Sequence, residues 1–122
     1  MNKISFDQFE AVDIRIGTVT EATVPEWSHW VMRIKVDLGP ELGIKQCFSG
    51  IMKFFKPEDL IGKQFPFVVN LEPRKIGPEK EMSEAMMIMS VPGEDLPEEE
   101  AENVSPVLFQ ISEKVPNGTK VR

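Results

Sequence analysis

Apolar and polar residues alternate along much of the chain in the period-two pattern of β-strands. The clearest run extends from Trp30 to Leu38, where every second residue is apolar and Arg33, Lys35 and Asp37 fall between. This alternation is typical of a strand with one buried and one solvated face. Other runs predict strands at 14–20, 43–49, 65–71, 86–91 and 107–111. Because Pro66 has no N–H to donate, it places the 65–71 strand at a sheet edge or marks its start.

Helical signals are few and short. Ser5 and Gln8 have the spacing of a capping box, which predicts a helix over 5–10. Within it, Phe6 and Phe9 share one face. Residues 57–60, Pro-Glu-Asp-Leu, favour a second helical turn. Five or six short strands, with one small helix between the third and fourth, predict an all-β, five-stranded OB-fold barrel with a helix before it and an extension after it.

Length and composition add limits to this picture. The 122 residues, 41% of them hydrophobic, suit one domain over 1–122 that folds without disulfides or bound metal ions. A lone cysteine, Cys47, excludes an internal disulfide and is expected in the core. With a single histidine as well, no Cys/His metal site is expected. No run is apolar enough for a membrane span or a signal peptide, so the protein is expected to be cytoplasmic.

The net charge of −6 is unevenly distributed. Residues 94–102 hold six acids and no base, and they account for the whole excess, so the remaining chain is neutral. Strong nonspecific binding to phosphate is therefore not expected. The acidic 92–106 segment has two interpretations that the sequence leaves open. It is a solvated loop, or it is an electrostatic brake that repels RNA from one face.

Catalytic signatures are absent from the sequence. There is no glycine-rich phosphate loop, and neither serine nor cysteine stands in a nucleophile elbow. His29, between Ser28 and Trp30, fits a surface or packing residue better than a general base. The sequence thus favours noncovalent binding without a cofactor.

One stretch has the chemistry of a nucleic-acid site. A strand ends near Asn70, Pro73 stiffens its exit, and Arg74 and Lys75 follow on a predicted loop. Two cations on a rigid strand end suit a phosphate, and an Asn amide can both donate and accept. A plain solvated basic turn is the alternative. Lys53 precedes two phenylalanines that would either stack bases or belong to the core.

Methionine and phenylalanine form a second candidate constellation. Met82, Met86, Met87 and Met89 are close in sequence, and Met52 and Phe55 follow the third predicted strand. Flexible methionines can line a groove that accepts varied apolar side chains. A methionine-rich core is the alternative, since a strand that is apolar on both faces needs two covering layers.

Four ordered blocks carry a resemblance to a known family. Residues 9–19, 49–63, 69–76 and 115–120 together resemble the free-standing tRNA-binding OB-fold family, which also occurs fused to methionyl-tRNA synthetases. Residues 43–46 and 83–84, with the Val-Pro-Asn-Gly near the end, are similar to the CsaA branch of export-related chaperones. Residues 49–51 are more similar to the synthetase-appended branch.

The resemblance implies an OB barrel whose terminal extensions help to form a homodimer. It implies tRNA as a partner for the synthetase relatives, and export-precursor polypeptides and the secretion motor for CsaA-type members. Carried over by position, the RNA-facing candidates are Asn70, Arg74, Lys75, Ser83 and Lys53. The polypeptide-binding candidates are Met52, Phe55, Met86 and Ile88.

Three departures from the family pattern bear on whether the main ligand is tRNA or a polypeptide. Residues 25–30 replace the usual turn after the first strand, residues 79–81 lie in an apparent insertion, and Glu84 adds an anion. These changes favour a CsaA-like chaperone that retains tRNA binding. The alternative is a tRNA-binding accessory subunit acting in trans with methionyl-tRNA synthetase. Five apolar residues outside the predicted barrel core are expected at the dimer interface: Phe6, Phe9, Val107, Leu108 and Phe109.

Overall fold

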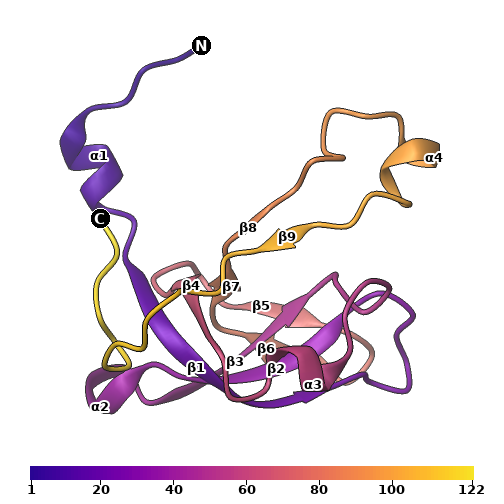
Figure 1. Cartoon of the computed structure of the whole chain (residues 1–122), viewed down its shortest axis with the longest axis horizontal. Coiled ribbons are helices and arrows are strands. Elements are labelled where there is room, and N and C mark those ends of the chain that lie inside the picture. The colour runs from indigo at the N-terminus through magenta and orange to yellow at the C-terminus, as the bar shows by residue number, and fades with distance from the viewer.

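Five antiparallel strands wrap into a nearly closed barrel in the computed structural model, which describes residues 1–122 (Figure 1). Their order is β3-β2-β1-β4-β7. The strands are β1 (Ile14–Thr23), β2 (Met32–Asp37), β3 (Ile44–Ser49), β4 (Gln64–Val68) and β7 (Met86–Met87). The predicted OB-like, all-β fold is confirmed, including the small helix α3 (Pro57–Leu60) between the third and fourth strands.

Strand β1 crosses the whole barrel and pairs with both β2 and β4. Its pairing with β2 is irregular between Val19 and Glu21, and such a bulge increases the local bend. Gly17 permits a close approach of β2, because a Cβ there would lie 2.5 Å from Val36 Cγ2. The strand can therefore coil tightly enough for the sheet to close.

The barrel closes between β3 and the residues just before β7. Glu84 N–H donates to the Gln46 carbonyl at 2.7 Å, and Phe48 N–H donates to Ser83 Oγ at 3.2 Å. Ser83 is buried at this seam. Gln46 adds two more hydrogen bonds, from its N–H to Glu84 Oε1 and from its side-chain amide to the Met82 carbonyl, so four hydrogen bonds complete the closure of the sheet.

The core follows the alternation in the sequence. Met32, Ile34 and Val36 on β2 are fully buried, as is Cys47 on β3. Trp30 differs from the prediction, because it is 62% exposed. Ser28 Oγ accepts the N–H groups of Trp30 and Val31, which makes a turn, so the strand begins only at Met32.

The prediction that Pro66 marks a sheet edge or a strand start is wrong. Strand β4 lies between β1 and β7, and Pro66 is in its middle, opposite Ile16. Pairing between β4 and β7 covers only Phe67 and Val68, so the ladder stops where proline has no N–H to offer. The Pro66 carbonyl still accepts from Ile88 N–H at 3.1 Å.

The predicted 86–91 strand is divided between two sheets. Strand β7 completes the barrel, whereas β8 (Met89–Ser90) leaves it and pairs with β9 (Val107–Leu108). Residues 91–106 between β8 and β9 project from the barrel as an arm, which we call the acidic arm (Figure 1). Near its tip is a four-residue helix, α4 (Glu98–Ala101), which has no buried residue.

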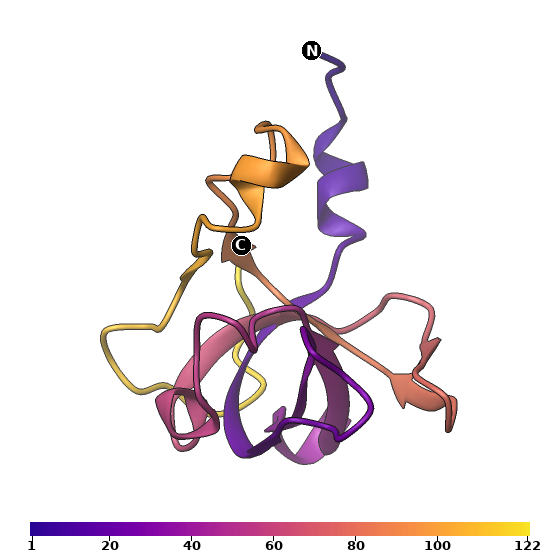
Figure 2. The same cartoon turned by 90° about the vertical axis from the view of Figure 1, so that its right-hand side faces the viewer.

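Helix α1 and the C-terminal residues lie on the same side of the barrel, and the first residues of the chain extend away from it (Figures 1 and 2). Helix α1 (Phe6–Glu10) has the predicted capping box, with Ser5 N–H donating to Gln8 Oε1 at 2.8 Å and Gln8 N–H donating back to Ser5 Oγ at 3.1 Å. Short helix α2 (Gly39–Leu42) joins β2 to β3. None of the helices is long and apolar enough to span a bilayer.

Candidate nucleic-acid interface

Two connections meet on the face of the barrel that OB folds use for oligonucleotides. Residues 24–31 join β1 to β2, and residues 69–85 join β4 to β7. In this fold the second and third strands and these two loops form the usual ligand surface. We call residues 24–31 the first loop and residues 69–85 the second loop.

The second loop contains a hairpin that the sequence did not predict. Strands β5 (Arg74–Ile76) and β6 (Glu81–Ser83) pair around a turn in which Gly77 has φ +77° and Lys80 has φ +55°. The predicted loop position of Arg74 and Lys75 is therefore wrong, because both lie on β5. Three-residue strands are too short for an alternation signal, and their pairing depends on the turn.

The hairpin separates the two adjacent cations. Neighbouring side chains on a strand point to opposite faces, so Arg74 and Lys75 diverge. Arg74 is paired with buried Ser83, and Lys75 with Met82, which is 40% exposed. Both cations are exposed and neither forms an ion pair. They can thus meet two separate phosphates more readily than one.

Arg74 opens onto a groove of about 520 Å³ beneath the hairpin. Ser83 is at its base, held by the barrel seam, and Met86 is 48% exposed at its wall. The remaining lining residues are Phe48, Leu71, Glu72 and Ala85. The structure therefore brings together residues that the sequence assigned to different ligands, Arg74 and Ser83 to RNA and Met86 to polypeptide.

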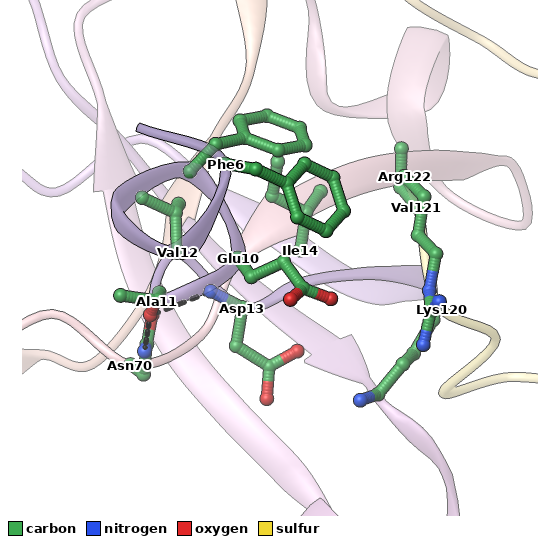
Figure 3. Close-up of a pocket in the computed structure, with 11 residues that line it drawn as sticks. Phe6, Glu10, Ala11, Val12, Asp13, Ile14, Asn70, Lys120, Val121 and Arg122 are labelled. Carbon is green, nitrogen blue, oxygen red and sulfur yellow. Dashed lines mark hydrogen bonds between the residues drawn. The ribbon is translucent and has the colours of Figure 1, made fainter. Parts of the chain in front are cut away.

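Asn70 lies elsewhere, beside the N-terminal segment. Its Oδ1 accepts from Asp13 N–H at 2.9 Å, and its Nδ2 donates to the Ala11 carbonyl at 2.6 Å, as Figure 3 shows. It borders a cavity of about 310 Å³ between α1 and the C-terminal residues. Its amide thus ties the chain after α1 to the end of β4, and both its donor and its acceptor are engaged there.

Lys53 contacts the acidic arm. Its Nζ donates to the Glu102 carbonyl at 2.6 Å and lies 3.4 Å from Asn103 Oδ1. The same ammonium is 5.8 Å from the centre of the Phe54 ring, within cation–π distance. Lys53 therefore fastens the arm to the loop after β3.

The other polypeptide candidates are dispersed. Phe55 packs against the core and borders a cavity of about 580 Å³ together with Val107 and Leu108. Met52 and Ile88 are half-buried and border neither this cavity nor the groove beside Arg74.

Three residues that the sequence analysis did not single out hold the hairpin against the barrel. Arg33 Nε donates to Glu81 Oε1 at 2.8 Å, and Nη2 donates to Oε2 at 2.6 Å. The hydrogen bonds from Arg33 hold the pKa of Glu81 below its ordinary range, against an opposing effect of burial. The Trp27 ring lies 6.1 Å from the Phe48 ring, and Arg33 lies 5.8 Å from that ring. Arg33 and Glu81 are 48 positions apart, so no local pattern could connect them.

No group of three or more His, Cys, Asp or Glu side chains is arranged to hold a metal ion. Burial raises the pKa of the Cys47 thiol to about 12, so the thiolate needed for nucleophilic chemistry is essentially unpopulated at neutral pH. The exposed cations and the groove are suited to binding an anionic polymer.

Two solved structures are similar to this chain over almost its whole length. The chain is 36% identical to the chaperone CsaA of Bacillus anthracis, with a TM-score of 0.81 and coverage of 99% of this chain and all of that one. A methionyl-tRNA-synthetase-related protein of Pyrococcus horikoshii is 28% identical, with a TM-score of 0.84 and full coverage of both chains.

Longer proteins match over part of their length. The methionine–tRNA ligase of Leptospira interrogans is 42% identical over 94 residues, which are 77% of this chain and 13% of the ligase. That of Methanothrix thermoacetophila is 48% identical over 73 residues, which are 60% of this chain and 10% of the ligase. The family model described as "Putative tRNA binding domain" matches residues 14–120. The chain therefore belongs to the tRNA-binding-domain family.

Proposed function

We propose that this protein binds tRNA noncovalently, through β2, β3 and the basic hairpin of the second loop. The observation that carries the proposal is the hairpin itself, which presents Arg74 and Lys75 exposed and free of ion pairs. Its position on the ligand surface of an OB barrel and the family match over 14–120 support the same ligand. Binding of tRNA implies action in the cytoplasm.

Few phosphate contacts are available, so recognition rests on shape more than on charge. Lys35 pairs with Glu21 at 3.3 Å and Lys45 with Glu84 at 3.9 Å, which reduces their value to a phosphate. Because the rest of the chain is neutral and the arm is acidic, the affinity for tRNA is moderate, and it falls as the salt concentration rises.

A homodimer is part of this proposal. Phe6 is 68% exposed, Val107 is 54% exposed and Phe109 is 45% exposed, all outside the barrel core. Helix α1 and the acidic arm rise from the same side of the barrel (Figure 2), so a two-fold partner on that side would cover both. Sedimentation at micromolar concentration should give a dimer, and a monomer alone would contradict this part of the proposal.

A second candidate function is a CsaA-like chaperone for unfolded export precursors. The similarity to CsaA of B. anthracis favours it, as do the cavity beside Phe55 and the exposed Met86 in the groove. Apolar side chains of an extended polypeptide suit both places. Such a chaperone would be expected to meet the secretion motor.

An accessory role with methionyl-tRNA synthetase is the remaining alternative. The chain corresponds to only 10–13% of the length of the methionine–tRNA ligases that it matches. A separate copy of such a domain would supply tRNA affinity to a synthetase in trans.

One titration separates these functions. The purified protein is titrated with bulk tRNA and with a permanently unfolded apolar polypeptide, each at 50 and 200 mM salt. We expect tRNA affinity to fall by about tenfold between the two salts if Arg74 and Lys75 each contact one phosphate, because counterions are released from each neutralised phosphate. Polypeptide affinity should change little, since simple salts at these concentrations alter apolar burial only slightly. Absence of tRNA binding at 50 mM salt would refute the proposed function.

A further inference from the structure

Two contacts join the ligand loops to each other and to β2. Trp27 of the first loop packs on Gly77 of the second loop, and Arg33 of β2 binds Glu81 of the second loop. We call these four residues the loop clamp. It fixes both ends of the β5–β6 turn, because Gly77 begins the turn and Glu81 follows it.

The Trp27 contact depends on the absence of a side chain at position 77. A Cβ on Gly77 would lie 2.5 Å from Trp27 Cζ2 and 2.6 Å from Cη2, closer than any carbon contact allows. Gly77 also has φ +77°, which L-residues with side chains rarely adopt. The indole Nε1 is buried and contributes to the lowered pKa of Glu81, but it does not reach full hydrogen-bond geometry, so the ring is held mainly by packing.

The Arg33–Glu81 pair is more than a surface ion pair. Two parallel hydrogen bonds give the fork geometry that is strongest for guanidinium and carboxylate. The side chains are 26% and 20% exposed, so water screens them only in part. Glu81 lies opposite Ile76, two positions from the Arg74–Ser83 pair, so the ion pair orients the strand that carries the basic residues.

We infer that Glu81 is a positioning residue for tRNA: through the loop clamp it holds the hairpin so that Arg74 and Lys75 meet the ligand on a preformed surface. The inference rests on the proposed tRNA binding. It assigns an acidic residue a favourable role in binding a polyanion. The opposing view is that Glu81 only neutralises Arg33 and keeps it from a phosphate.

These two views predict opposite signs for Glu81→Gln. Glu79→Gln is the matched control, because Glu79 is exposed on the same turn, forms no ion pair and acts on Arg33 only through space. Both variants lose one negative charge. We expect Glu79→Gln to raise tRNA affinity slightly at 50 mM salt. Glu81→Gln should lower affinity about three- to tenfold, the usual cost of ordering a loosened loop and its side chains on binding. A gain in affinity and a steeper salt dependence in Glu81→Gln would overturn the inference, since Arg33 would then be a freed phosphate contact.

A double-mutant cycle tests whether Glu81 acts through the hairpin. In an Arg74→Ala, Lys75→Ala background the effect of Glu81→Gln on tRNA affinity should largely disappear. An undiminished loss in that background would contradict the inference, because Glu81 would then act independently of the two cations.

A measurement without RNA separates failure of the clamp from failure of the proposed function. Amide hydrogen exchange over residues 74–83 should be faster in Glu81→Gln than in wild type, and unchanged in Glu79→Gln. Cys47 should stay unreactive in both variants, which verifies that the barrel is intact. If wild type does not bind tRNA, the proposed function is lost while the exchange result still reports on the clamp. Equal exchange in all three proteins would refute the clamp.

Discussion

Two hairpins extend from the same barrel, and they differ in almost every physical respect. The β5–β6 hairpin lies against the barrel, held by a bidentate ion pair and by the Trp27 ring, and presents cations. The acidic arm on β8 and β9 projects away from the barrel (Figure 1). The Lys53 side chain, which donates to the Glu102 carbonyl, ties the arm to the loop after β3. Its carboxylates on residues 94–102 form no ion pair.

The contrast indicates how one small domain can attract a polyanion with one hairpin and weaken its binding with the other. A basic element must be rigid to benefit from short-range phosphate contacts, because those depend on position. An acidic element can act over a Debye length, about 8 Å at physiological salt, and so needs no fixed geometry. The hairpin is accordingly held by a bidentate ion pair and by ring packing, whereas the arm is tethered through the Lys53 side chain.

The largest expected effect comes from removing the two cations of the β5–β6 hairpin. Arg74→Ala with Lys75→Ala should weaken tRNA binding and lower the slope of log affinity against log salt by roughly 0.7–0.9 for each lost contact. Lys114→Ala with Lys120→Ala is the control, since it removes the same charge from the C-terminal segment, on the far side of the barrel (Figure 2). Filter binding across a salt series measures both. Equal slopes in the two double variants would reduce the hairpin to a solvated basic turn.

A smaller effect is expected from the acidic side. Glu98, Glu99 and Glu100 are exposed on α4, and changing all three to glutamine should raise tRNA affinity a few-fold at low salt. The gain should shrink above physiological salt, where screening is stronger. The free energy of unfolding should change by less than about 0.5 kcal/mol, as is usual for solvated positions. If affinity for an uncharged apolar polypeptide rose equally, the arm would be covering a shared site, and the electrostatic brake would be excluded.

Acid should release the hairpin before it unfolds the barrel. Because Arg33 holds the pKa of Glu81 below its unfolded value, the pair stabilises the fold above the ordinary glutamate range, and this stability is lost as pH falls through the lowered pKa. Chemical denaturation between pH 7 and pH 3 should therefore show a weaker pH dependence in Glu81→Gln than in wild type. The Glu79→Gln variant should follow wild type, and an identical pH profile in all three proteins would show that the ion pair contributes nothing to stability.

The smallest effect is expected at Cys47, which reports on the barrel beneath both hairpins. Its thiol is fully buried, and burial raises its pKa to about 12, so a thiol reagent at pH 8 should not modify the folded protein. Labelling should become fast in denaturant. Fast labelling of a hairpin or arm variant without denaturant would mean that the substitution opened the barrel, and its binding data would need that explanation.

Much of the barrel could be predicted from the sequence, whereas most of the interface could not. The β2 alternation, the Ser5–Gln8 cap and the core position of Cys47 are local signals that the structure confirms. The β5–β6 hairpin depends on a glycine turn and on a partner 48 residues away, which periodicity does not report. The four-residue helix α4 is too short to have a pattern of its own.

The residues proposed for RNA illustrate why side-chain chemistry alone is ambiguous. Asn70 has the donor and acceptor that a base edge needs, but the structure uses both on the backbone of residues 11 and 13. Ser83 is engaged at the barrel seam. An amide or hydroxyl satisfies whichever backbone group is nearest, and the sequence does not indicate which one that is.

The C-terminal residues cover an open edge of β1 without forming a regular strand. Ile16 N–H donates to the Thr119 carbonyl at 2.9 Å, and Gly118 N–H donates back to Ile16 at 2.7 Å, so the last residues cover β1 where β2 has diverged from it. Buried Gln64 is satisfied by the same segment, through the Val115 carbonyl and the Asn117 side chain. Trimming this segment would expose a bare sheet edge, the kind of template on which another chain can add a strand. A truncated form should therefore associate edge to edge, and fusion partners placed here must leave residues 115–121 free to pair.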